Sequence, residues 1–510
     1  MNLVVKVIQN RYIDSVSLMA LSTKANQIEA IEQVIIAMAT DMNKEVMKNV
    51  GLFNEVVEKA ESSDLIIVMK LKETGEEEAV LAEVEALLDR KEKVDLSTGP
   101  RVFKTIKEAH EYDDTTNLAL ISVNGHFAAR EAQQAIDEEM HVMMFSDNVS
   151  IKDEIDLKDQ AIKKGLLMMG PDCGTAIINQ IGLGFANKVR AGNIGIVGAS
   201  GTGSQEVSVR IHEFGGGISQ LLGVGGRDLS REVGGKMMLA SMQALAEDPN
   251  TDVLLLVSKT PAPEVEIKII QQAKKIDKPI VIWFVGEMMN KVDGNLHFVD
   301  MSKNAALKAV ELAGINTSQL DLHPLNLPLI ADVRKKLNPE QKYIRGLFTG
   351  GTLCSEAYYI AKEKYSNVAS NTVHSTEPID ETVNHTFIDY GSDEFTDGKP
   401  HPMIDPSNRI EGFNRVATDP TVGVILLDFV LGYGAHEDPV GVMVPEILAA
   451  KAAAKKAGRH LEIIGYILGT PLDEQNLEGQ LAKLESTGAT YASSMQNAGL
   501  LAREFVEKGE

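Results

Sequence analysis

The chain has 510 residues, of which 44% are hydrophobic and 24% charged, and a length of this order predicts about three or four domains. The formal net charge of −23 argues against a nucleic acid or an anionic membrane as partner, because phosphate groups are bound by positive surfaces. The chain has two cysteines, so no disulfide framework is expected. Its start lacks the apolar run of a signal segment, and the apolar stretch at 421–434 is too short to span a bilayer. We therefore expect a cytoplasmic location and no metal site.

Residues 1–98 are predicted to form a small α+β domain with a ferredoxin-like βαββαβ or βαββα arrangement. The segments 3–8 and 64–72 are rich in aliphatic and β-branched residues, which is typical of strands. The segment 15–39 is predicted to contain a helix. Residues 76–93 have apolar side chains at three- and four-residue spacing, which predicts an amphipathic helix.

After a polar linker predicted at 94–114, apolar strands alternate with amphipathic helices. Strands are predicted at 117–123 and 141–146, each is followed by a predicted helix, and the motif GPDCG (170–174) ends the segment. Continuous apolar strands between helices indicate a parallel sheet that is covered on both faces. Residues 115–191 are therefore predicted to be a separate α/β domain.

An internal repeat is the strongest organisational signal. One copy begins with NIGIVGASGTGSQE and the other with YIRGLFTGGTLCSE, and both continue through matching blocks in the same order. Each copy has an Asp-Pro pair, at 248–249 and 419–420, that ends a predicted helix before an apolar strand. The repeat predicts two doubly wound, flavodoxin-like domains over 192–325 and 340–510.

In each copy, the first strand meets a turn rich in Gly, Ser and Thr that opens a helix. Glycine permits positive φ angles and close approach of a ligand to the backbone. The helix N-terminus then offers unpaired N–H groups and a positive dipole end to a carboxylate, a phosphate or carbamoyl phosphate. A single turn of this kind is usually a structural cap, but two equivalent copies favour an anion site. The predicted anion-binding residues are Ser200, Gly201, Thr202 and Gly203 in one turn and Gly350, Gly351 and Thr352 in the other.

Other candidates follow predicted strands. Arg227 lies in the turn GVGGRDLS, where doubly wound sheets bind ligands, although a solvated turn fits equally well. Lys259 and His436 follow corresponding strands of the two copies and are either site residues or surface residues. Cys173 is predicted to be a buried structural thiol. The core is predicted to include the methionine pairs at 143–144, 168–169 and 288–289.

The loop 398–409 (GKPHPMIDPSNR) has a high density of functional groups between three prolines, which favours a site over a linker. The candidates that it contributes are Lys399, His401, Asp405 and Arg409.

These motifs together carry a family resemblance. The order GPDCG, IGIVGASGTGSQE, GVGGRD and KPIVIWFVG resembles the α subunit of succinyl-CoA synthetase, and the final domain resembles the ligase domain of its β subunit. FSDNVSIKDE, GPDCGTAI, GASGTG, GGRDLS and GKPHPMIDP resemble the FdrA branch of acyl-CoA synthetase-like proteins. The resemblance covers roughly residues 115–505. It implies a Rossmann-like CoA-binding-type domain at 115–191 and two ligase-type domains after it.

The resemblance also implies a candidate phosphohistidine. In the synthetases, such a residue lies between two Gly-rich helix N-termini, and His297 follows Pro279 at a similar interval. However, GNLHFVD replaces the family's Gly-His-Ala-Gly, and Ser258 and Lys259 stand where the family has an acidic residue. Loss of that carboxylate disfavours an imidazolium or a phosphohistidine.

FdrA-type proteins are associated with the large component of an oxamate carbamoyltransferase, which interconverts oxalurate plus phosphate with oxamate plus carbamoyl phosphate. The resemblance therefore implies a carbamoyltransferase subunit that acts on small anions, forms a dimer and works with other subunits encoded nearby. For that reaction, the cations expected to bind the anions are Arg227, Lys259, Lys399 and Arg409. The expected catalytic residues are His401 as first choice of proton shuttle, His436 as second, and Asp405. The sequence contains neither an ATP-grasp pattern nor the synthetases' first CoA-holding βα unit, so we expect no required cofactor and leave CoA binding open. The alternatives are a component of an ADP-forming acyl-CoA synthetase that uses a phosphohistidine, and a non-catalytic ligand-sensing scaffold.

Overall fold

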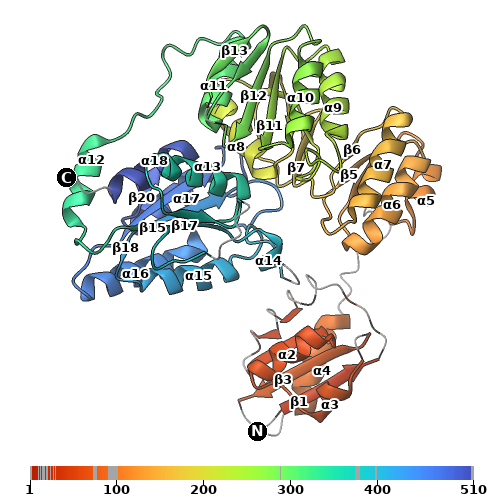
Figure 1. Ribbon diagram of the computed structural model, residues 1–510. Helices are drawn as coiled ribbons and strands as arrows, with labels where there is room; N and C mark the ends of the chain where they lie inside the picture. Colours follow the sequence, from red (N-terminus) through yellow and green to blue (C-terminus); the bar gives the residue numbers. More distant parts are fainter. Residues whose placement is uncertain are drawn as a thin grey trace. The chain divides into compact units, whose positions relative to one another are not determined.

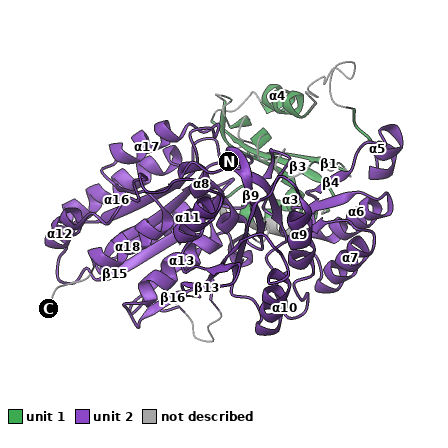
Figure 2. Cartoon of the chain, turned by 90° about the horizontal axis from the view of Figure 1, so that it is seen from above, with its two compact units in different colours: residues 1–103 green, residues 104–510 purple. Residues whose placement is uncertain are grey.

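The chain forms two compact units, residues 1–103 and 104–510, which Figure 2 shows in different colours. In the computed structural model, every described helix is too short or too polar to cross a membrane. The described residues are 3–9, 11, 13, 18, 21–22, 25–26, 28, 30–61, 63–72, 77–89, 101–287, 289–373, 379–396 and 399–506.

The first unit is an antiparallel sheet with helices on both faces (Figure 1). Its strands run in the order β1-β3-β2, and side chains of β3 alternate between a core under α4 and a core under α2 and α3. Strand β2 occupies the second half of the segment in which a helix was predicted. The elements are β1 (Leu3–Ile8), β2 (Ile31–Met38), α2 (Asp41–Asn49), α3 (Glu55–Lys59), β3 (Leu65–Leu71) and α4 (Glu77–Asp89).

The second unit begins with a small parallel sheet in the order β4-β5-β6. Residues 175–184, which fall inside the domain predicted at 115–191, form the hairpin β7–β8, and this hairpin pairs with β10 of the next sheet. The elements of this region are α5 (Ile106–Tyr112), β4 (Leu118–Ile121), α6 (Gly125–Asp137), β5 (His141–Met144), α7 (Ile151–Lys163), β6 (Met168–Met169), β7 (Thr175–Ile178) and β8 (Ile181–Gly184).

An eight-stranded sheet follows, in the order β13-β14-β12-β11-β9-β10-β7-β8. Its five parallel strands, β10-β9-β11-β12-β14, have the flavodoxin-like order. Helices α9 and α10 cover one face, and α8 and α11 cover the other (Figure 1). The elements are β9 (Ala191–Gly198), α8 (Gly201–Glu213), β10 (Ile218–Gly223), α9 (Lys236–Glu247), β11 (Val253–Lys259), α10 (Pro263–Ala273), β12 (Ile280–Val285), β13 (Lys291–Asp293), β14 (Leu296–Phe298) and α11 (Ser302–Leu312).

The second repeat is an all-parallel sheet in the order β16-β17-β15-β18-β19-β20, so β17-β15-β18-β19-β20 repeats the flavodoxin-like order. The predicted duplication of a doubly wound fold is confirmed. The elements are α12 (Leu327–Lys336), β15 (Tyr343–Phe348), α13 (Gly351–Lys362), β16 (Val368–Ser370), β17 (His385–Asp389), α14 (Asp393–Thr396), α15 (Ser407–Ala417), β18 (Val422–Val430), η1 (Gly441–Met443), α16 (Val444–Lys456), β19 (Glu462–Leu468), α17 (Leu477–Ser486), β20 (Thr490–Ala492) and α18 (Met495–Phe505).

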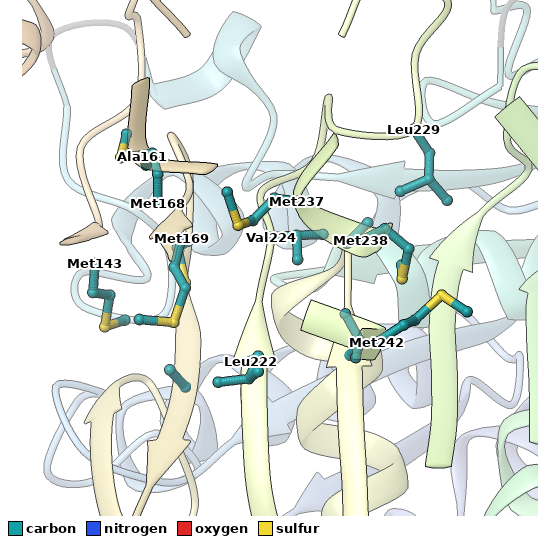
Figure 3. Close-up of a cluster of buried hydrophobic side chains, with 14 of the residues drawn as sticks. Met143, Ala161, Met168, Met169, Leu222, Val224, Leu229, Met237, Met238 and Met242 are labelled. Carbon is teal, nitrogen blue, oxygen red and sulfur yellow. The ribbon is translucent and has the colours of Figure 1, made fainter. Parts of the chain in front are cut away.

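A methionine-rich core joins the small sheet to the eight-stranded sheet (Figure 3). Unbranched methionines fill irregular gaps between elements of different curvature. The pairs at 143–144 and 168–169 are buried as predicted, whereas Met289 is 42% exposed and Met288 lies outside the described residues. The core methionines are Met140, Met143, Met144, Met168 and Met169 from the small-sheet region and Met237, Met238 and Met242 from α9.

The two repeats pack through their inner helices. Helix α8 contacts α11 and α13, and α18 contacts α13 and α11, so these four helices lie between the two large sheets. Because α8 and α13 each follow the first strand of a repeat, this packing brings the two Gly-rich turns together.

Candidate functional site

The first Gly-rich turn connects β9 to α8. Ser200 is the N-cap, and its Oγ accepts a hydrogen bond from the N–H of Gly203 at 3.1 Å. A Cβ on Gly198 would lie 1.9 Å from Ser204 Oγ, so the tight turn requires glycine there. In the described part of the chain, the N–H groups of Gly201 and Thr202 have no hydrogen-bond partner, as is usual for a first helical turn.

A buried ion pair holds the second turn, which connects β15 to α13. Asp428 Oδ1 accepts from the N–H of Thr349 at 2.8 Å, and its Oδ2 accepts from the N–H of Gly350 at 3.0 Å. Arg409 Nη1 lies 2.9 Å from Asp428 Oδ1, and both side chains are at most 2% exposed. Arg409 therefore lies behind the turn, and the structure does not bring it to the predicted anion site.

The two turns contact each other directly. Ser200 Oγ and Thr352 Oγ1 form a hydrogen bond. A Cβ on Gly203 would lie 2.9 Å from Thr352 Cγ2, and a Cβ on Gly350 would lie 2.9 Å from Thr202 Cγ2. Each threonine methyl thus packs on a glycine of the opposite turn, which gives the pair of helix N-termini a twofold-like arrangement.

Lys259 and Asp389 flank the start of α13. A Cβ on Gly351 would lie 2.5 Å from Asp389 Oδ2 and 3.7 Å from Lys259 Nζ. Lys259 is exposed and has no ion-pair partner within 4.0 Å among the described residues. Asp389 Oδ1 accepts from the N–H of Gly391 at 2.9 Å. Burial raises the pKa of Asp389 to about 6, although the Gly391 hydrogen bond and the Lys259 charge oppose the rise.

Asp172, in the motif GPDCG, lies on the α8 side. The main chain is fixed by hydrogen bonds from the N–H of Asp172 to Ser146 O at 2.9 Å and from the next N–H to Met144 O at 3.0 Å. Two residues further, Gly174 Cα lies 3.6 Å from the position of a Cβ on Gly201. Residue Asp172 is exposed to solvent, yet desolvation by the surrounding protein, together with the Asp147 charge, raises the pKa of its carboxyl group to about 7.

His401 lies beside the loop that follows Asp389. A Cβ on Gly391 would lie 2.5 Å from His401 Nε2. The N–H of Met403 donates to Nδ1 at 3.2 Å, so a neutral ring carries its proton on Nε2. Burial lowers the pKa of His401 to about 4. At neutral pH the residue is therefore a hydrogen-bond donor at Nε2, and it is poorly suited to accept a proton there.

Two predicted cations have protein partners. Arg227 Nη2 lies 3.0 Å from Glu154 Oε2 and donates to Val149 O at 2.8 Å, which attaches the strand-end turn to the start of α7. Lys399 is exposed and donates to Asn408 Oδ1 at 3.1 Å. Only Lys259 among the predicted cations therefore stands next to a Gly-rich turn in the described residues.

The remaining proton-shuttle candidates make local contacts. Asp405 Oδ1 accepts from the N–H of Ser407 at 3.0 Å, at the start of α15. His436 Nδ1 accepts from the N–H of Asp438 at 2.9 Å, and the N–H of His436 donates to Met403 O at 2.8 Å. His436 thus supports the loop that carries His401.

His297 does not lie between the helix N-termini. It occupies the middle of β14 and pairs with Val281 of β12. Strand β14 is three positions from β9 in the sheet, which corresponds to about 14 Å at the usual strand spacing. Its Nδ1 is buried without a hydrogen-bond partner, and burial lowers the pKa. The interval from Pro279 to His297 thus reflects two neighbouring parallel strands.

Sequence reasoning missed three aspartates. Asp172 lies in GPDCG, where only Cys173 was considered. Asp389 ends β17 two residues before Gly391, and Asp428 lies inside the apolar stretch at 421–434. In each case the available signal was an acidic residue in or next to a strand end, where doubly wound sheets place their ligand sites.

Comparison with known proteins supplies the family. A CoA-ligase model matches residues 347–505, a CoA-binding-domain model matches 189–286, and a model described as AllF, heavy metal-associated domain, matches 1–100. An uncharacterized protein of Escherichia coli K12, YahF, is 53% identical over 506 residues, which is 98% of each chain. The chain belongs to the succinyl-CoA synthetase-like family. The CoA-binding match falls on the region predicted as the first ligase-type domain.

The comparisons also find more distant matches. The α subunit of succinate–CoA ligase from Aquifex aeolicus is 28% identical over 194 residues, which is 37% of this chain and 62% of that subunit. A solved structure of an acetyl-coenzyme A synthetase from Ca. Korarchaeum cryptofilum is 15% identical, covers 80% of this chain and 86% of its own, and has a TM-score of 0.32.

The name of the N-terminal domain model raises the question of a metal. Residues 1–103 contain neither cysteine nor histidine, the ligands that soft and borderline metals prefer. Across the described residues, no three His, Cys, Asp or Glu side chains are placed to hold a metal ion. The residues present therefore do not fit a heavy-metal site.

Proposed function

We propose that the chain is a carbamoyltransferase subunit that interconverts oxalurate plus phosphate with oxamate plus carbamoyl phosphate. The observation that supports the proposal most is the direct contact of two helix N-termini, marked by the Ser200–Thr352 hydrogen bond. Both substrates are anions, and paired N-termini offer fixed N–H donors that need no reorganisation when charge develops during reaction.

Three further features support anion binding at these turns. In the described residues, the N–H groups of Gly201 and Thr202 at the start of α8 and of Gly351 and Thr352 at the start of α13 have no protein acceptor. Lys259 adds a positive charge beside Gly351. Thr175 is 2% exposed, its Oγ1 has no hydrogen-bond partner, and this atom lies 3.6 Å from the position of a Cβ on Gly201. A buried unpaired hydroxyl is costly and is common at ligand sites.

The family models favour a second candidate, an acid–CoA ligase component. The phosphohistidine form of that chemistry needs an imidazole between the helix N-termini. His297 lies on β14, three strand positions from β9, the strand that leads into the first Gly-rich turn. Labelled ATP with a nucleotide-binding partner subunit would then give an acid-labile phosphoprotein that His297→Ala abolishes. A ligand-sensing scaffold would leave partner activity unchanged in His401→Ala.

The test is a phosphate-dependent assay of oxalurate loss and carbamoyl phosphate formation by the chain together with its partner subunits. Lys259→Gln is expected to weaken inorganic phosphate binding, because the charge next to Gly351 is lost. The matched control is Lys291→Gln, an exposed lysine on β13 that should bind phosphate like the wild type. Absence of turnover in the complete assembly would refute the proposal.

A further inference from the structure

Two carboxylates stand on opposite sides of the paired helix N-termini, Asp172 by α8 and Asp389 by α13. Lys259 interacts electrostatically with both. We propose that Asp172 donates the proton to the departing oxamate nitrogen and that Asp389 accepts the proton of the attacking hydrogen phosphate. This inference rests on the carbamoyltransferase function proposed above.

The setting of Asp172 suits a proton donor. Its carboxylate accepts no hydrogen bond from the described residues and faces solvent. The backbone φ is +58°, a conformation that is uncommon for a residue other than glycine and that clusters at functional positions. A Cβ on Gly226 would lie 3.1 Å from Asp172 Oδ2, so the glycine leaves space beside the carboxylate.

The setting of Asp389 suits a proton acceptor. Oδ1 is held by the Gly391 N–H, whereas Oδ2 accepts no hydrogen bond from the described residues and lies against Gly351. A phosphate at the N-terminus of α13 would meet the free N–H groups, the Lys259 ammonium and this oxygen. The hydroxyl of hydrogen phosphate is the one donor on that anion, and Oδ2 is placed to accept it.

The proposed reaction conserves its protons and requires no cofactor. A hydrogen phosphate oxygen forms a bond to the ureido carbon of oxalurate, and the bond from that carbon to the oxamate nitrogen breaks. The phosphate proton goes to Asp389, and the nitrogen receives a proton from Asp172. Transfer from Asp389 to Asp172 through solvent restores both groups. The products are carbamoyl phosphate and oxamate, with the atoms and total charge of the reactants.

The charges around Asp172 permit a test that distinguishes a general acid from a purely structural residue. Desolvation raises the pKa of Asp172 most, the charges of Asp147 and Asp393 raise it further, and those of Lys259 and Arg227 lower it. A general acid must be protonated, so the rate falls as pH rises through its pKa. Removal of the Asp147 charge lowers that pKa, and Asp147→Asn should therefore move the alkaline limb of kcat to lower pH with the plateau rate retained.

The direct variant is Asp172→Asn, because asparagine tolerates the left-handed backbone conformation and keeps the side-chain shape. We expect kcat to fall about 10²–10⁴-fold, the range for loss of a general acid. Inorganic phosphate, titrated calorimetrically, should still bind. Wild-type kcat in Asp172→Asn, or an unmoved alkaline limb in Asp147→Asn, would overturn the role of Asp172 and leave the proposed function standing. Absence of oxalurate turnover in the wild-type assembly would overturn both.

Discussion

Glu206 and Glu356 occupy equivalent positions in α8 and α13, and each carboxylate bonds to the opposite repeat. Glu356 accepts from the N–H of Ser302 at 2.9 Å, at the start of α11. Glu206 accepts from the hydroxyl of Tyr466 and lies near the start of α18. Both carboxylates are fully buried, so the twofold-like arrangement of the turns continues into a reciprocal pair of contacts between the repeats.

These contacts make stability depend on pH. Burial, together with the Glu206 charge, raises the pKa of Glu356 to about 8 from 4.5. The folded state therefore holds this proton more tightly than the unfolded state, and the free energy of unfolding falls as pH rises from 4.5 to about 8. The glutamine of Glu356→Gln cannot ionise, so the free energy of unfolding of this variant should not show this fall. Its stability relative to the wild type should therefore increase as pH rises across this window. Parallel denaturant titrations at pH 5 and pH 8 measure the difference, and an equal offset at both values would contradict it.

Gly203→Ala should separate the two turns. The added Cβ would lie 2.9 Å from Thr352 Cγ2, and the packed helices leave little room for either residue to move. Overpacking of this kind costs about 1–3 kcal/mol, and calorimetric titration should show weaker phosphate binding. Gly201→Ala is the steric control for stability, because its Cβ would meet ordinary contacts at 3.6 Å. Equal melting temperatures of the two variants would show that the turns are not in close contact.

Arg409 should matter for folding and not for anion contact. Arg409→Met leaves Asp428 charged and buried without its partner, which typically destabilises by about 3–5 kcal/mol. The folded fraction should retain the phosphate affinity of the wild type. Denaturant unfolding and calorimetric titration check the two parts. Normal stability with lost phosphate binding would instead make Arg409 a direct ligand.

His401→Gln should not remove a titration near neutral pH. The wild-type ring has a pKa of about 4, so it is already neutral through the neutral range. Glutamine retains a donor and an acceptor near Gly391 and Met403. The rate against pH should keep its shape in this variant, with a change in amplitude only. Loss of the alkaline limb would identify His401, and not Asp172, as the titrating group.

Much of the fold could be predicted because the duplication and the alternation of strands and helices produce recognisable patterns in the local sequence. The pairing of β7 with β10 could not, since a short hairpin carries no signal for the sheet that it joins. Strand β2 was hidden because a run such as IEQVIIAM fits either a helix or a strand. The Gly-rich turns were found through their glycines.

The charged residues were harder to place. In the sequence, Arg409 and Lys259 look equally available to bind an anion. In the structure, Arg409 is buried in an ion pair with Asp428, whereas Lys259 is exposed. Asp172 and Asp389 owe their raised pKa values to desolvation by segments that are distant in the chain. Charge neutralisation and desolvation of this kind are properties of tertiary packing, so local sequence cannot report them.

The Ser200–Thr352 contact joins residues 152 positions apart, and residues 313–326 connect the two repeats between α11 and α12. A covalent tether of this length replaces a bimolecular association by an intramolecular one with a high effective concentration. Assembly of the paired turns is therefore independent of dilution and fixed at one copy of each half. Expression of the halves as separate polypeptides would convert the same site into one whose occupancy follows protein concentration.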